Sequence, residues 1–156
     1  DLIFIDAFND LSVPYHLTTR EFTARLRERL APDGAVVANV IDNYAKGRFL
    51  ASYVKTLESV FGRGNVALIL DSVEDASDTQ STYVVVASSS IDRALTGMYK
   101  ERTLGDPVMA AGYVIPADEL QRYLTGRKAI VLTDDYVPVD NFLAPLFAER
   151  FADEGR

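Results

Sequence analysis

The chain has 156 residues, 48% hydrophobic and 25% charged, which is the composition of one ordinary globular domain. It has no cysteine, which excludes a disulfide framework and cysteine-ligated zinc and favours a cytoplasmic setting. The net charge of −7 argues against nucleic-acid binding, and no apolar run is long enough for a membrane span. We therefore expect neither nucleic acid nor membrane as a partner of this segment.

The chain opens on an apolar run, Leu2 to Ile5, which is typical of a parallel strand buried on both faces. Asp6 follows at the carboxyl end, where open α/β sheets bind their ligands. Asp6 is therefore a candidate for chemistry, and capping of the next turn is the alternative role. Because the chain begins inside a strand with no initiator methionine, we expect it to be a piece of a longer protein with more strands upstream.

The next segment has the pattern of a helix followed by a second strand. An apolar residue recurs every fourth position over 22–30 and predicts an amphipathic helix, with Thr18 or Thr19 as its N-cap. Glu21 stands three residues after Thr18, which is the spacing of a capping box. The apolar run 35–40 predicts the next strand, so the order strand, helix, strand predicts a parallel βαβ unit.

The rest of the chain also has the patterns of helices and strands in turn. Asn43 is predicted to cap a second long helix, and the runs 66–70 and 82–87 predict two strands that pair in antiparallel fashion. Further helices are expected over residues 91–102, 116–123 and 142–151.

Two further groups are candidates for a site. Asp134 and Asp135 follow an apolar run, so their side chains could reach the same crevice as Asp6. The alternative is that one of them caps the last helix or holds the turn before Pro138. His16 is the only histidine, which excludes a multi-histidine metal site, and we expect no metal. It acts either as an auxiliary acid or base or as a packing residue of its loop. The sequence contains neither a phosphate-binding glycine-rich loop nor a nucleophile elbow. If the protein binds a nucleotide-like cofactor, we expect the glycine-rich part of that site to lie outside this chain.

Four segments carry a resemblance to a known family: Asp1–Phe8, Pro14–Phe22, Leu30–Asn39 and Leu132–Asp140. They resemble the second half of a spermidine synthase-like domain, the polyamine aminopropyltransferase branch of the S-adenosylmethionine-dependent methyltransferase fold. The last segment resembles the closing motif of the subgroup often fused to membrane transporter segments. The resemblance implies an α/β fold with a Rossmann-like, methyltransferase-type sheet. That sheet is expected to be mostly parallel, with an antiparallel carboxyl-terminal hairpin, and incomplete at its amino-terminal side. Residues 1–156 would form the carboxyl-terminal part of a single catalytic domain.

The resemblance also implies a transferase reaction. Asp6 matches the aspartate that takes the proton of a di- or polyamine, which then attacks decarboxylated S-adenosylmethionine and displaces methylthioadenosine. Asn9 stands where the family has a second aspartate that holds the diamine, and Asp10 replaces a proline. Asn39 falls where a glutamine follows the next strand in the family. The expected substrate-binding residues are Asn9, Asp10, Asn39, Asp134, Asp135 and Tyr136.

The implied partners are small molecules. Decarboxylated S-adenosylmethionine or S-adenosylmethionine would bind as a substrate, with its main binding loop outside this chain, and a small amine would be the acceptor. A homo-oligomer is expected. Two alternatives stay open: a methyltransferase-like enzyme with another acceptor, and a non-catalytic Rossmann-like module for ligand sensing or association, with which Asn9 is consistent.

Overall fold

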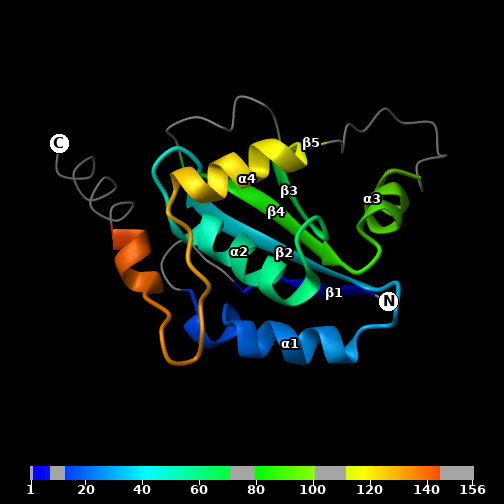
Figure 1. Ribbon diagram of the computed structural model, residues 1–156, viewed down its shortest axis with the longest axis horizontal. Helices are drawn as coiled ribbons and strands as arrows, with labels where there is room; N and C mark the ends of the chain where they lie inside the picture. Colours follow the sequence, from blue (N-terminus) through cyan, green and yellow to red (C-terminus); the bar gives the residue numbers. More distant parts are fainter. Residues whose placement is uncertain (1, 8–12, 71–79, 101–111, 145–156) are drawn as a thin grey trace.

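The computed structural model describes residues 2–7, 13–70, 80–100 and 112–144 (Figure 1). The strands are β1 (Leu2–Ile5), β2 (Ala35–Asn43), β3 (Val66–Leu70), β4 (Gln80–Ser88) and β5 (Tyr113–Val114). The helices are the short 3-10 helix η1 (Tyr15–Leu17), α1 (Arg20–Arg29), α2 (Phe49–Phe61), α3 (Ile91–Lys100) and α4 (Ala117–Gly126). The described strands form one sheet in the order β1-β2-β4-β3-β5.

Strand direction departs from the expectation of a mostly parallel sheet, which is not confirmed. Among the described strands, β1 and β2 pair in parallel, as predicted, and the pairs β2–β4, β3–β4 and β3–β5 are antiparallel. The connection from Leu70 to Gln80 is shorter than the dozen or more residues that a parallel return requires. Strand β4 therefore turns back, as predicted for the hairpin, and pairs with both β2 and β3.

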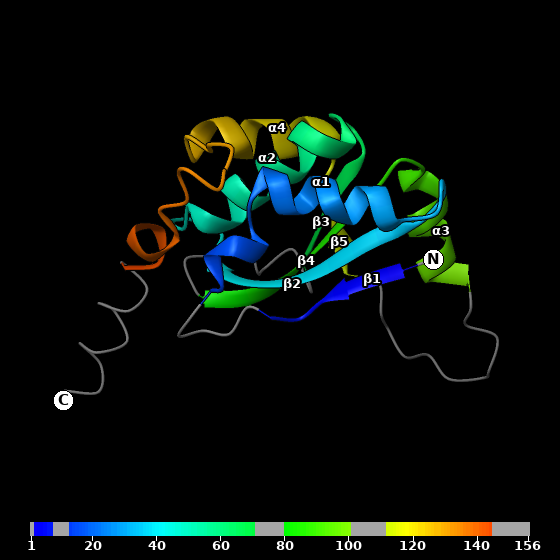
Figure 2. The same cartoon turned by 90° about the horizontal axis from the view of Figure 1, so that it is seen from below.

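Helices cover both faces of the sheet (Figures 1 and 2). Helices α1, α2 and α4 lie together on one face, and α3 lies at the other. Val36 of β2 belongs to the core on the first face, together with the buried side of α2. Val37, the next residue, packs with Ile91 and Leu95 of α3 on the second face. Alternate residues of β2 thus serve two separate apolar clusters.

Strand β1 is covered on one face, so the expectation of burial on both faces is wrong. Ile3 and Ile5 pack against the core under α1 and α2. Leu2 and Phe4 point the other way and are 61% and 56% exposed, because no described element covers them. In the described part of the sheet, β1 is an edge strand.

The boundary between β2 and α2 also differs from the prediction. Strand β2 continues to Asn43 because β4 supplies a pairing partner along its whole length, up to the pair Asn43–Gln80. Helix α2 begins at Phe49 instead, and its N-cap, Arg48, makes no side-chain capping bond. Asn43 is thus a strand residue, and the prediction that it caps the helix is wrong.

The cap of α1 is Thr19, whose side chain accepts a hydrogen bond from the N–H of Phe22 at 3.2 Å. Thr19 was one of the two predicted caps, whereas the capping box of Thr18 with Glu21 is not formed. Helix α4 runs to Gly126, further than expected, and the last helical stretch starts at 139 rather than 142. The predicted end of this last helix, at residue 151, lies outside the described residues. So do residues 101–102, the predicted end of α3. None of the described helices is long and apolar enough to cross a bilayer.

Candidate functional site

Asp6 and Asn39 meet where β1 ends. The parallel register pairs Ile5 with Ala38, so the next residue of each strand lies side by side. The Nδ2 of Asn39 donates a hydrogen bond to Oδ1 of Asp6 at 3.3 Å. Asp6 is exposed and Asn39 is half-buried. An amide therefore orients a solvent-accessible carboxylate at the carboxyl end of β1. Asn39 lies within β2 rather than after it, since β2 continues four residues further.

Asn9 and Asp10, the two other residues expected near Asp6, lie outside the described residues.

His16 and Asp134 line one cavity, although they are far apart in the sequence. The cavity has a volume of about 340 Å³ and is lined by Tyr15, His16, Leu17, Phe22, Arg25 and Asp134. The His16 ring is exposed and meets the ring of Tyr15 edge to face, with centroids 5.6 Å apart. Neither Asp6 nor Asn39 lines this cavity. The structure thus groups Asp134 with His16 and leaves Asp6 with Asn39.

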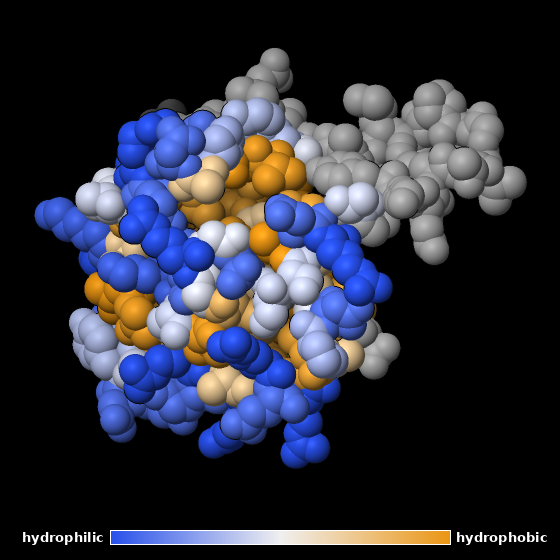
Figure 3. All heavy atoms as spheres, turned by 45° about the vertical axis from the view of Figure 1, so that its right-hand side comes forward, coloured by the Kyte–Doolittle hydropathy of each residue, from blue (hydrophilic) through white to orange (hydrophobic). Residues whose placement is uncertain are grey.

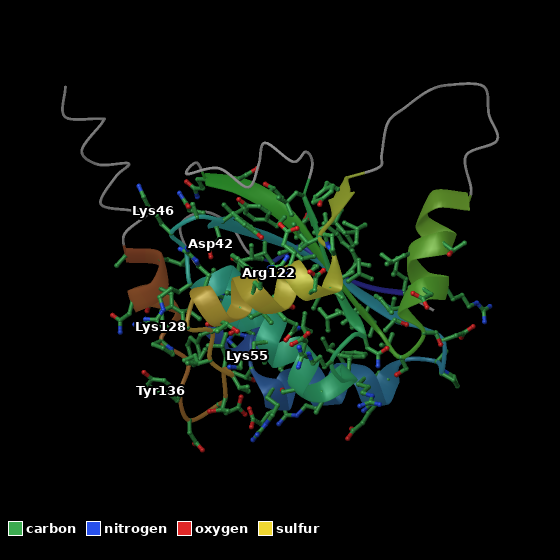
Figure 4. All side chains as sticks on the ribbon, turned by 45° about the horizontal axis from the view of Figure 1, so that its top comes forward. Asp42, Lys46, Lys55, Arg122, Lys128 and Tyr136 are labelled. Carbon is green, nitrogen blue, oxygen red and sulfur yellow. The ribbon has the colours of Figure 1, made fainter. Side chains whose placement is uncertain are left out.

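The segment that carries Asp134 is fastened to α2. The hydroxyl of Thr56, which is fully buried, accepts a hydrogen bond from the N–H of Leu132 at 2.8 Å. The Nζ of Lys55 donates to the carbonyl of Ala129 at 2.8 Å. Figure 4 shows Lys55 on α2, and Tyr136 on the loop that follows α4. Residues 129–132, an apolar run in the sequence, are therefore bound by side chains and do not pair as a strand.

The turn after this segment is closed by its own backbone. Thr133 and Tyr136 exchange hydrogen bonds, N–H to carbonyl, at 3.0 and 3.1 Å. Asp134 and Asp135 sit at the tip of the turn, and both are exposed. We call residues 133–136 the acidic turn. It presents two carboxylates to solvent, one of them at the cavity with His16.

Tyr136 faces a different cavity. It is 63% exposed and lines a space of about 410 Å³ together with Lys46, Arg48, Ile130, Pro138, Asn141 and Phe142. The guanidinium of Arg48 lies 4.6 Å from the centre of the Phe142 ring. The described residues that line this cavity include two cationic side chains and no carboxylate, so their charge disfavours a protonated amine at that position.

Asp42 is a buried acid that sequence reasoning missed. It lies in β2, is fully buried, and accepts hydrogen bonds from the backbone N–H groups of Asn43 at 2.8 Å and Leu50 at 2.7 Å. Burial raises the pKa of its carboxyl to about 6, an effect that outweighs these hydrogen bonds. Asp42 holds the first turn of α2, so its role is structural. The sequence signal was an acid within an apolar strand shortly before an apolar helix.

A further cavity, of about 430 Å³, lies beside β3 and β5, at the edge of the sheet away from β1. The start of β3 borders it, together with residues of α3 and α4 such as Leu95 and Leu120. Figure 3 looks onto the α3 side of the molecule and shows apolar side chains gathered among hydrophilic ones. None of the expected site residues that the structure describes lines this cavity. Among the described residues, no group of three or more histidine or acidic side chains is arranged to hold a metal ion.

Two curated proteins resemble part of the chain in sequence. The chain is 35% identical over 66 residues to a probable polyamine aminopropyl transferase of Bifidobacterium longum (strain NCC 2705), covering 42% of this chain and 15% of that protein. It is 37% identical over 62 residues to a polyamine aminopropyltransferase of Vibrio vulnificus (strain CMCP6), covering 40% of this chain and 20% of that protein. No family model matches the chain.

A solved structure has the same fold over most of the chain. It is a probable spermidine synthase from Corynebacterium glutamicum ATCC 13032, with a TM-score of 0.62 and 22% sequence identity, covering 86% of this chain and 47% of that chain. Together, these matches support a spermidine synthase-like family, with sequence similarity over about 40% of the chain. The chain spans about half of the matched structure, and the alignments span a fifth or less of the curated relatives.

Proposed function

We propose that this chain is the carboxyl-terminal part of an aminopropyltransferase that uses decarboxylated S-adenosylmethionine and a di- or polyamine. The observation that carries the proposal is the hydrogen bond between Asn39 and Asp6 at the carboxyl end of β1. It holds an exposed carboxylate where ligands of open α/β sheets bind. The relatives named polyamine aminopropyltransferase support the class of reaction.

In the proposed step, Asp6 is the base. A protonated amine is first held by the carboxylate, which then accepts one proton from the nitrogen as the nitrogen becomes a nucleophile. The nitrogen lone pair forms a bond to the methylene of the donor's aminopropyl group that is attached to the sulfonium. The carbon–sulfur bond breaks, its electron pair stays on sulfur, and methylthioadenosine leaves. Asn39 keeps the carboxylate oriented, which lowers the cost of reaching the reactive geometry.

The acidic turn is the proposed second contact for the amine. Asp134 borders the cavity with His16, and Asp135 and Tyr136 complete the turn. A carboxylate there attracts the second ammonium of a diamine, and His16 serves as an auxiliary proton acceptor or hydrogen-bond partner. Asn9 and Asp10 belong to the proposed site by their positions in the sequence.

The test uses the longest natural polypeptide that contains this sequence. With putrescine and decarboxylated S-adenosylmethionine, it should release methylthioadenosine, and Asp6→Asn should abolish the release. Asp33→Asn is the matched control, because Asp33 is an exposed acid at the other end of β2 and should leave turnover unchanged. Turnover that survives Asp6→Asn would rule out Asp6 as the base.

Two further outcomes separate the alternatives. Methyl transfer from S-adenosylmethionine to another acceptor, without aminopropyl transfer, would favour the methyltransferase alternative. Binding of an adenosyl ligand with no turnover on any amine would favour a sensing module. Calorimetry of the 156-residue chain alone should show no tight adenosyl binding, because the expected glycine-rich loop is not in its sequence. Micromolar affinity would contradict that expectation.

A further inference from the structure

Three hydrogen bonds clamp the start of the acidic turn between α1 and α2. The N–H of Leu132 donates to Thr56 of α2 at 2.8 Å, and its carbonyl accepts from the N–H of Arg20, the first residue of α1, at 2.8 Å. Two residues on, the N–H of Asp134 donates to Oε2 of Glu21 at 3.0 Å. The first two bonds fix the entry to the turn. The third is the one that reaches its tip.

Glu21 is well placed to hold this contact. Its other oxygen, Oε1, accepts a hydrogen bond from Nη2 of Arg20 at 2.8 Å, which fixes the direction of the carboxylate. A hydrogen bond from its own backbone N–H is the main cause that lowers the pKa of the Glu21 carboxyl, and the guanidinium of Arg20 lowers it further. Glu21 is therefore ionised at neutral pH. A charged acceptor forms a stronger hydrogen bond with an amide than a neutral one does. This contact uses the backbone of Asp134 and leaves its carboxylate available to a ligand.

We infer that Glu21 is a positioning residue, which holds the acidic turn against the cavity with His16 and thereby sets the affinity for the amine. The part of this inference that concerns amine affinity rests on the proposed function. Phe22, the residue after Glu21, lines the same cavity, so one short stretch of α1 both forms part of its wall and holds Asp134 at it.

Hydrogen exchange of the Asp134 amide tests the contact without any assay of activity. In Glu21→Ala the amide loses its acceptor and should exchange about tenfold faster, as expected for the loss of one hydrogen bond to a charged group. In Glu21→Gln the side-chain carbonyl still accepts, so exchange should stay within about threefold of the unsubstituted protein. Glu28→Ala removes an exposed acid from the same helix and should change nothing.

Steady-state kinetics test the effect on the amine, in the same polypeptide used for the turnover assay. Glu21→Ala should raise the KM for putrescine about tenfold and leave kcat within about twofold, because the reacting groups at Asp6 are untouched. Glu21→Gln should restore most of the affinity. A merely structural role would instead lower kcat and thermal stability together.

The possible failures are distinguishable. If the unsubstituted protein turns over no amine, the proposed function fails, and with it the amine-binding part of this inference. Hydrogen exchange then still decides whether Glu21 holds the turn. If turnover is present but Glu21→Ala changes neither the Asp134 exchange nor the KM, the positioning role is overturned and the proposed function stands.

Discussion

The carboxylate of Asp42 accepts a hydrogen bond from the N–H of Leu50 at 2.7 Å, across the junction between β2 and α2. Helix α2 has no side-chain cap at Arg48, so this buried acid supplies an acceptor for its first turn. The chain reaches that arrangement because Gly47 brings its backbone against Asp42. A Cβ at position 47 would lie 2.0 Å from Oδ1 of Asp42.

The titration of Asp42 should make stability depend on pH. Burial raises its pKa from 3.8 to about 6. Between about pH 4 and 6 the folded chain therefore keeps a proton that the unfolded chain releases, and stability falls as the pH rises through this window. A pKa change of this size corresponds to about 3 kcal/mol.

Asp42→Asn has no such titration and is the reference for this effect. Chemical unfolding of both proteins at several pH values should show the stability of the natural chain falling relative to Asp42→Asn by about 2 kcal/mol from pH 4 to pH 6, the part of the full effect that lies between these two pH values. A difference that does not change with pH would contradict the assignment of a raised pKa to Asp42.

Gly47→Ala should destabilise the chain by about 2 kcal/mol or more, because the new methyl group meets the buried carboxylate and a backbone carbonyl. Gly126→Ala is the matched control. Gly126 lies in the last turn of α4, and a Cβ there meets nothing within 4 Å. This control should gain about 0.5–1 kcal/mol from the better helix propensity of alanine. Thermal denaturation monitored by circular dichroism measures both.

Thr56→Val should cost about 1–3 kcal/mol, because it leaves the buried N–H of Leu132 without its acceptor while keeping the shape of the side chain. Ser59→Ala is the control, since Ser59 is exposed and its hydroxyl donates only to a carbonyl of the same helix. It should stay within about 0.5 kcal/mol. Equal losses in urea unfolding for both variants would count against a special role for the Thr56 contact.

Asn39→Ala should lower kcat/KM for the amine about tenfold, the loss expected when one hydrogen bond to a carboxylate is removed from the site. Asn39→Gln keeps the amide and should retain more activity. Steady-state assays of methylthioadenosine release make the comparison. Unchanged kinetics in Asn39→Ala would show that Asp6 needs no support from β2.

Local patterns in the sequence were enough for most of the elements. The four-residue apolar period over 22–30 predicted α1, and the β-branched runs at 35–40 and 66–70 predicted β2 and β3. The short return after Leu70 predicted the antiparallel pairing of β4. These features depend on periodicity and connection length, which neighbouring residues along the chain determine.

Contacts between distant segments decided the rest. Strand β2 extends to Asn43 because β4 pairs with it there, and this pairing also makes most of the described sheet antiparallel. Asp6 was identified as a candidate from its place after a strand, but its partner Asn39 is set by the register between β1 and β2. Glu21, predicted to form a capping box with Thr18, accepts a hydrogen bond from the backbone of a residue 113 positions away. Burial and hydrogen bonds of this kind arise only when the chain folds, so the sequence by itself determined the candidate residues, and the tertiary structure decided which of them meet.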